Sequence, residues 1–151
     1  MSTKTNDHAI SVLNDLIQTC KDGQEGFQTA SEGVKSTSLK SLFSEYSLQR
    51  AQFAGVLQQE VNRLGGSPET GGSVSASLHR GWMNIKSAVT GSDESAIVAE
   101  CERGEDAARD AYQKALKEHL PVDVRSMVES QFVEVKQGHD KVRSLEVKMA
   151  R

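Results

Sequence analysis

The chain has 151 residues, of which 36% are hydrophobic and 5% aromatic, and it contains 12 glycines and 2 prolines. This composition predicts one domain of ordinary core size over residues 1–151, and it argues against a β-sandwich. The 18 lysines and arginines stand against 21 aspartates and glutamates, a formal charge of −3. Since these charges are spread along the chain, neither a nucleic-acid partner nor a membrane surface is expected.

The cysteine count and the first residues bear on the compartment. Cys20 and Cys101 lie about 80 positions apart, so they form neither a disulfide framework nor a zinc site. No apolar run approaches the ~20 residues of a membrane span. The first eight residues lack the apolar stretch of a signal peptide. The sequence therefore predicts a cytoplasmic protein.

The first predicted helix covers residues 7–34, with Asn6 as its N-cap. Apolar or small residues recur there at the helical spacings of three and four, at Ile10, Leu13, Leu16, Ile17, Cys20, Phe27, Ala30 and Val34. The glycine and hydroxyl residues at 33–38 predict a short turn. The next helix is therefore expected to be an antiparallel neighbour.

The second predicted helix ends at Gly65 and Gly66, where glycine suits a C-cap. Its apolar stripe is interrupted by Arg50 and otherwise consists of Leu39, Phe43, Tyr46, Phe53, Leu57, Val61 and Leu64. Residues 65–72 predict a long connection. Within it, residues 74–89 predict a short amphipathic helix whose apolar residues are Leu78, Trp82, Ile85 and Val89.

Two further long helices complete the prediction. Ser92 is the predicted N-cap of one that ends at Leu120 and has the stripe Ile97, Cys101, Glu105, Ala108, Tyr112 and Ala115. Pro121 suits the first turn of the other, whose stripe is Val124, Val128, Gln131, Val135, Gly138 or His139, Val142, Leu145 and Met149. Two tight hairpins joined by one long crossover predict an all-α, ferritin-like four-helix bundle with a short helix in the crossover.

Charged residues stand where the helical period requires apolar ones. An unpaired buried charge costs several kcal/mol, so such residues should find partners. The stripes and their flanks predict a buried charge network of Glu25, Arg50, Glu102, Glu105, Lys136 and His139, with Tyr46 and Tyr112 as tyrosines whose hydroxyls support it. If Glu25 and Glu105 lie at the same height along the bundle axis, the two cysteines are separated by about 13 Å along that axis. That separation excludes a disulfide, and both thiols are expected to be small core side chains.

Three stretches resemble the signatures of a bacterial family of uncharacterised ferritin-like four-helix-bundle proteins. They are residues 13–23 (LNDLIQTCKDG), 78–86 (LHRGWMNIK) and 101–108 (CERGEDAA). The resemblance extends over nearly the whole chain. It implies a ferritin-like fold, a cytoplasmic protein without an established activity, and an association with stress responses in related ferritin-like proteins.

The wider superfamily binds two metal ions through one Glu from each of two helices and a Glu-x-x-His from each of the other two. In this chain the two Glu-x-x-His motifs correspond to Ser47-x-x-Arg50 and Lys136-x-x-His139. A guanidinium cannot ligate a metal, but it can pair with a carboxylate through two hydrogen bonds. The departure predicts a degenerate metal site, in which Arg50 and Lys136 supply the positive charge of the absent ions.

Three functions stay open. The first is a non-enzymatic structural or interaction protein without a cofactor. The second is an iron or manganese oxidase or peroxide-reducing protein with the ligands Glu25, Glu102, Glu105 and His139, against which the charge of Arg50 argues. The third is a metal-storage cage. The alternative to any such site is an ordinary apolar core in which these charged side chains face the solvent.

Two surfaces are possible packing partners for the connecting helix. It is marked by His79, Arg80, Trp82 and Lys86, and its apolar face must cover something. Either it covers the side of its own bundle or it forms a homodimer contact, in which Trp and Arg are frequent. The identity of any other protein partner does not follow from the sequence.

Overall fold

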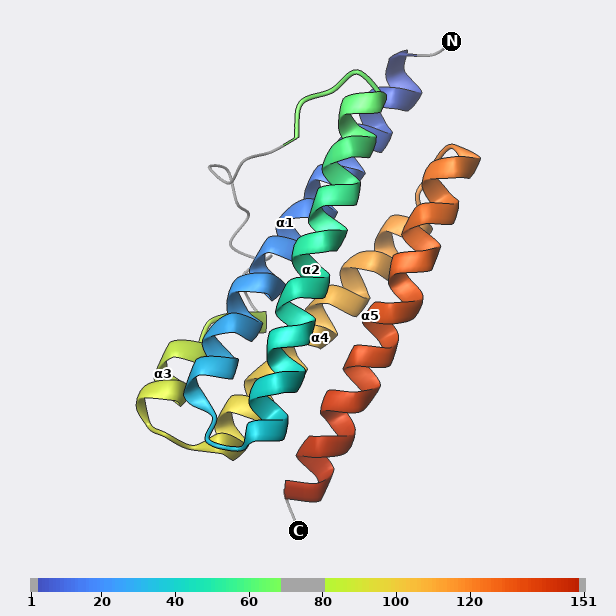
Figure 1. The fold of residues 1–151 in the computed structure, drawn as a ribbon. Coiled ribbons are helices and arrows are strands. Elements are labelled where there is room, and N and C mark those ends of the chain that lie inside the picture. Colours follow the sequence, from blue (N-terminus) through green and yellow to red (C-terminus); the bar gives the residue numbers. More distant parts are fainter. Residues whose placement is uncertain (1–2, 69–80, 150–151) are drawn as a thin grey trace.

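The computed structural model describes residues 3–68 and 81–149, and in these ranges the regular secondary structure is entirely helical (Figure 1). Its elements are α1 (Thr3–Gly33), α2 (Thr37–Arg63), α3 (Ile85–Thr90), α4 (Glu94–Leu116) and α5 (Val122–Met149). The four long helices form one bundle, in which α1 is antiparallel to α2 and to α4, and α4 is antiparallel to α5. Since α2 and α4 point the same way, the end of α2 and the start of α4 lie at opposite ends of the bundle, and α3 directly precedes α4. This is the architecture that the helical stripes predict.

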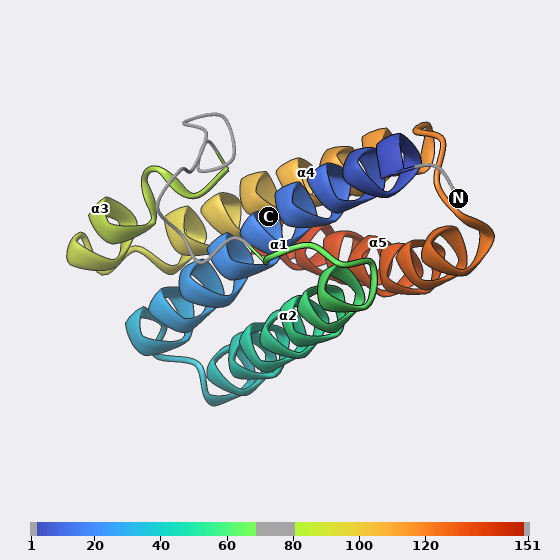
Figure 2. The ribbon, with the colours of Figure 1, turned by 90° about the horizontal axis from the view of Figure 1, so that it is seen from above.

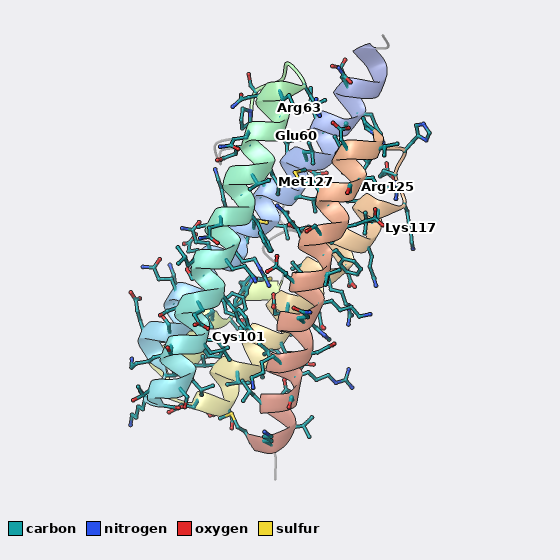
Figure 3. All side chains as sticks on the ribbon, turned by 45° about the vertical axis from the view of Figure 1, so that its right-hand side comes forward. Glu60, Arg63, Cys101, Lys117, Arg125 and Met127 are labelled. Atoms are coloured by element: carbon teal, nitrogen blue, oxygen red, sulfur yellow. The ribbon has the colours of Figure 1, made fainter. Side chains whose placement is uncertain are left out.

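The helix ends show why the chain turns where it does. The Ser36 hydroxyl accepts a hydrogen bond from the amide of Leu39 at 3.3 Å and caps α2. After α2, Gly65 adopts a φ of 89°, a left-handed conformation that favours glycine. At the same end of the bundle as Gly65, Arg125 of α5 (labelled in Figure 3) donates to the carbonyls of Leu116 and Glu118, at 2.7 Å each, and so satisfies the end of α4.

The predicted limits of α4 need correction at both ends. The N-cap is Asp93 instead of Ser92, and its carboxylate accepts from the amide of Ala96 at 3.2 Å. Ser92 is held in the preceding turn, because its amide donates to the carbonyl of Val89 at 3.0 Å. The helix ends at Leu116, four residues before the predicted end.

The core consists of two apolar clusters that lie one above the other along the bundle. One cluster contains Leu13, Leu16, Ile17, Cys20, Phe53, Leu57, Ala108, Tyr112, Val128 and Val135. The other contains Phe27, Val34, Phe43, Trp82, Ile85, Ile97, Cys101 and Val142. Between the two clusters lies a middle layer, the level that holds the buried side chains of Arg50 on α2 and Glu105 on α4. Another buried carboxylate, Glu100, lies on α4 among members of the second cluster.

The helix α3 and the residue Trp82 before it lie against the outside of α1 and α4 (Figure 2). The Trp82 side chain is buried, and its ring meets that of Phe27 edge-on at 5.0 Å. Gly26 and Gly104 make room for the indole, since a Cβ on Gly104 would lie 2.1 Å from Trp82 Cε2. The buried Glu100 carboxylate accepts a hydrogen bond from the amide of Asn84, which ties this segment to α4.

The connecting segment thus covers its own bundle, one of the two roles expected for it. The Trp82 indole itself packs between α1 and α4, and the homodimer contact expected through this segment stays a prediction. Within the described residues the helix covers Ile85–Thr90, whereas the sequence predicts it over 74–89. His79 and Arg80 lie outside the described residues. None of the helices in the described ranges is both long enough and apolar enough to cross a membrane.

Candidate functional site

The middle layer of the bundle is built around Arg50 of α2 and Glu105 of α4. The guanidinium donates two hydrogen bonds to the carboxylate, NH1 to Oε1 at 2.6 Å and NH2 to Oε2 at 2.8 Å. The side chains are 2% and 0% exposed. The remaining nitrogen, Nε, donates to Gln49 Oε1 at 3.3 Å. All three nitrogens of the cation therefore have acceptors inside the bundle, and its charge is balanced by one carboxylate.

Glycines of the other two long helices face this ion pair. A Cβ on Gly23 of α1 would lie 3.3 Å from Arg50 Cγ, and one on Gly138 of α5 would lie 2.6 Å from Glu105 Oε2. A side chain at Gly138 would therefore displace the carboxylate. The guanidinium carbon also lies 5.5 Å from the centroid of the Phe27 ring, a cation–π contact.

The two charges of the pair stabilise each other at a buried site. Burial alone would lower the pKa of the Arg50 guanidinium, but the charge of Glu105 and its hydrogen bonds outweigh burial, so that this pKa is raised. Arg50 therefore stays cationic at any pH at which the protein is folded. Each charge needs the other, because desolvating either one alone is costly.

A second set of buried polar groups lies in the neighbouring apolar cluster. The Tyr112 hydroxyl of α4 donates to Gln131 Oε1 of α5 at 2.7 Å, and it lies 3.1 Å from Cys20 Sγ of α1. The Gln131 amide in turn donates to the carbonyl of Phe53 at 3.4 Å. These groups link all four long helices. The contacts of the Tyr112 hydroxyl are thus with Gln131 and Cys20. They do not include the Arg50–Glu105 pair, which this hydroxyl is predicted to support.

The cysteines lie in apolar surroundings that suppress their reactivity. Burial raises the pKa of the Cys20 thiol to about 11, against the opposing effect of the hydrogen bond with Tyr112. Burial also raises the pKa of the Cys101 thiol well above its ordinary value. Both cysteines are free and buried. They behave as small core side chains, as the sequence predicts, since a neutral thiol is a poor nucleophile.

Two members of the predicted charge network lie outside it. Glu25 and Lys136 are exposed, so their placement in a buried network is wrong. Each stands two residues from the glycine of its helix that faces the ion pair, Gly23 or Gly138, which is a rotation of roughly 200° around the helix axis. Glu25 instead lines a shallow surface pocket beside Trp82.

Glu102 and His139 lie in a separate cluster between α4 and α5, together with Asp106. One ligand atom from each of the three side chains can be chosen so that all lie within 4.8 Å of one another. The His139 Nε2 atom is 2.6 Å from Asp106 Oδ1. The hydrogen bond to the Glu146 carboxyl, burial and nearby negative charge raise the pKa of Glu102 to about 7, although Arg143 opposes the rise. This cluster borders the surface and is separate from the Arg50–Glu105 pair in the interior.

The functional residues that sequence reasoning missed are Asp106 and Gln131. Asp106 follows Glu102 by four residues and so shares its helix face, a signal that the sequence contains. Gln131 stands on the predicted stripe of the last helix, where its polarity is the exception. Tyr46, a predicted supporting tyrosine, is half-buried with its ring 5.3 Å from that of Phe27, and burial raises its pKa.

The interior donor set does not fit the two metal ions that a ferritin-like bundle implies. Among the described residues of the middle layer, α4 supplies the carboxylate of Glu105, and Arg50 binds both oxygens of that carboxylate. On α1, Gly23 faces the Arg50 side chain, and the neighbouring buried carboxylate of Asp22 accepts a hydrogen bond from Gln18 of its own helix. A dinuclear centre needs several carboxylates and imidazoles that converge on it, and a guanidinium donates only. The predicted ligand set Glu25, Glu102, Glu105 and His139 is likewise wrong, since its members occupy three separate places.

Comparisons with known proteins agree with the fold and identify the family. No curated protein matches the sequence significantly. Among solved structures, a mutant of Dps1 from Mycobacterium smegmatis is similar, with a TM-score of 0.77 and 13% sequence identity over 97% of this chain and 99% of that chain. At this identity the likeness shows the fold, and the predicted ferritin-like helical bundle is confirmed. A family model described as a domain of unknown function, DUF2383, matches residues 8–118, which is most of the chain. The chain therefore belongs to the DUF2383 family, and its fold is ferritin-like.

Proposed function

We propose that this chain is a non-enzymatic ferritin-like bundle in which an amino-acid ion pair replaces the interior metal site, and that it acts through its surface as an interaction protein. The observation that carries the proposal is the bidentate Arg50–Glu105 pair, with side chains that are 2% and 0% exposed. A cation fixed at this depth repels metal ions and occupies the carboxylate that would bind them. The middle layer is then a structural element of the core.

Oxidation of Fe²⁺ by oxygen tests this proposal. The wild-type protein should oxidise added Fe²⁺ no faster than buffer without protein, because Arg50 binds both oxygens of the Glu105 carboxylate and its charge repels the ion. The rate is followed by ultraviolet absorbance of the ferric product. A wild-type rate above that of buffer, lost in the Glu105→Gln variant but retained in Glu25→Gln, would place a working metal site in the interior and contradict the proposal.

We further propose that the partner is a second copy of the chain, which docks through the outer face of α2. From Leu48 to Gln59 the exposed residues of this face are Leu48, Gln52, Val56 and Gln59, and none is charged. Leu48 is 61% exposed and Val56 44%. In a chain with 26% charged residues, such a stripe has the composition of an interface core. Two copies related by a two-fold axis would cover it on both.

Sedimentation equilibrium distinguishes a dimer from a monomer. The wild-type protein should sediment as a dimer, and Val56→Glu should shift it to the monomer mass, because the charge would be buried in the contact. Val133→Glu on α5 is the matched control, since Val133 is also exposed (55%) but lies on another helix. A monomeric wild-type protein, or a dimer that Val133→Glu disrupts instead, would count against the α2 contact.

A further inference from the structure

The cluster between α4 and α5 contains a buried imidazole that faces two carboxylates. His139 is 3% exposed, and its Nε2 atom approaches Asp106 Oδ1 to 2.6 Å. Glu102 lies one helical turn before Asp106 on the same face of α4. The chosen ligand atoms of the three residues lie within 4.8 Å of one another, so a modest closure brings all three to an ion at about 2.0–2.2 Å from each.

The far side of the imidazole ring is also occupied. The Nδ1 atom lies 3.2 Å from Asp140 Oδ1, so this carboxylate can accept a hydrogen bond from Nδ1. Nε2 lies 2.6 Å from Asp106 Oδ1, and when a metal ion takes the place of the proton in that contact, the Nε2 lone pair is directed at the space between Glu102 and Asp106. A carboxylate behind a histidine that faces other donors is the usual arrangement around protein-bound metals, because it orients the ring and makes it more basic.

One cation already lies at the mouth of the cluster. The Arg109 NH1 atom is 3.2 Å from His139 Nε2, and NH2 is 3.7 Å from Asp106 Oδ1. The same guanidinium has a second partner, since NH2 is 3.5 Å from Asp110 Oδ1 on its outer side. The Arg109 side chain is 30% exposed, so it can turn toward Asp110 without crossing the core. Arg109 thus opposes an incoming cation but does not block the ligand atoms irreversibly.

We propose that Glu102, Asp106 and His139 bind one divalent first-row metal ion of the zinc and manganese class, and that Arg109 occupies its place in the metal-free protein. One imidazole and two carboxylates form a mixed nitrogen and oxygen donor set, which suits such ions better than Mg²⁺. The site lies between α4 and α5, apart from the Arg50–Glu105 pair, and does not depend on the proposed function.

Titration calorimetry with Zn²⁺ on protein stripped with a chelator tests the site. Wild type should bind one Zn²⁺ per chain. Asp106→Asn and His139→Gln should each weaken that affinity by more than about tenfold, because each removes a ligand. Arg109→Ala should strengthen the affinity, because it removes the competing cation. Mg²⁺ in excess should not displace Zn²⁺.

Matched controls separate this site from binding elsewhere. Asp7→Asn and His119→Gln change exposed groups of the same types, away from the cluster and from Arg109, and should leave the affinity unchanged. Arg109→Ala removes a partly exposed side chain and tests the site even if a ligand variant fails to fold. Absence of Zn²⁺ binding, or binding that survives both Asp106→Asn and His139→Gln, would overturn the assignment. Binding lost only in Glu105→Gln would contradict the proposed function as well, since it would place the ion in the interior.

Discussion

Replacing Arg50 with leucine should lower the free energy of unfolding by about 3–5 kcal/mol. The leucine fills much of the space of the arginine, so the loss comes from the Glu105 carboxylate, which stays fully buried without its counter-charge and without two hydrogen bonds. Urea unfolding followed by circular dichroism measures the change. A loss below about 1 kcal/mol would be that of a surface pair, and it would contradict the burial of this ion pair.

A surface arginine provides the matched control for this variant. Arg63 lies at the end of α2, where it pairs with Glu60 (Figure 3). It also pairs with Asp123 of α5. Its side chain is 52% exposed. Arg63→Leu should therefore cost at most about 1 kcal/mol, because water and salt screen exposed pairs. Arg50 and Arg63 both occupy α2, so the difference between the two variants isolates the effect of burial.

Replacing Gly104 with alanine should destabilise the protein by about 1–3 kcal/mol and move Trp82 out of its site. A Cβ at this position would lie 2.1 Å from Trp82 Cε2 and 2.6 Å from Nε1. Because Trp82 is the only tryptophan of the chain, its fluorescence reports this displacement alone. The emission maximum should shift to longer wavelength as the indole becomes exposed to water.

Gly55 of α2 is the control glycine. A Cβ there meets nothing within 4 Å, so Gly55→Ala should stabilise the protein by roughly 0.5–1 kcal/mol through the better helix propensity of alanine. If Gly104→Ala stabilises the protein equally and leaves the emission unchanged, the close packing of Trp82 on α4 is wrong.

The helices follow from the sequence because each long one carries a stripe of mainly apolar residues at the helical spacing. The stripes also locate Arg50 and Glu105, since a charge at a position that must be buried needs a partner, and a guanidinium and a carboxylate are complementary. The ends of α4 are less certain in advance, because Ser92 and Asp93 are adjacent residues that can both cap a helix. The hydrogen bonds of the preceding turn decide between them.

The remaining errors arise from helix rotation. The sequence places Glu25 in the interior because it stands near a gap in its stripe, and Lys136 because it stands one turn before His139. Glycines two residues away are instead the residues that face the pair. A single sequence fixes a helix face only to within about one position. A glycine on such a face also looks like a gap in the apolar stripe, because its role is to leave room for a side chain of a neighbouring helix. Only the packed structure shows that Gly138 faces Glu105.

The middle layer and the α4–α5 cluster use charge in opposite ways. In the layer, a carboxylate and a guanidinium balance each other inside a close-packed core, where neither is free to bind another ion. In the cluster, carboxylates outnumber the cations that neutralise them, and the pKa of Glu102 is raised to about 7 by its contact with Glu146, by burial and by other nearby negative charges. Any ion that this bundle binds is therefore expected near its surface.

The coupling free energy between Arg50 and Glu105 measures most directly whether the two neutralise each other in place of metal ions. A double-mutant cycle combines Arg50→Leu with Glu105→Gln under urea unfolding. Each single variant leaves one buried charge unpaired, whereas the double variant leaves none, so its loss should be smaller than the sum of the single losses by at least about 2 kcal/mol. Losses that simply add, within about 0.5 kcal/mol, would show that the two side chains do not depend on each other and would contradict the ion-pair core.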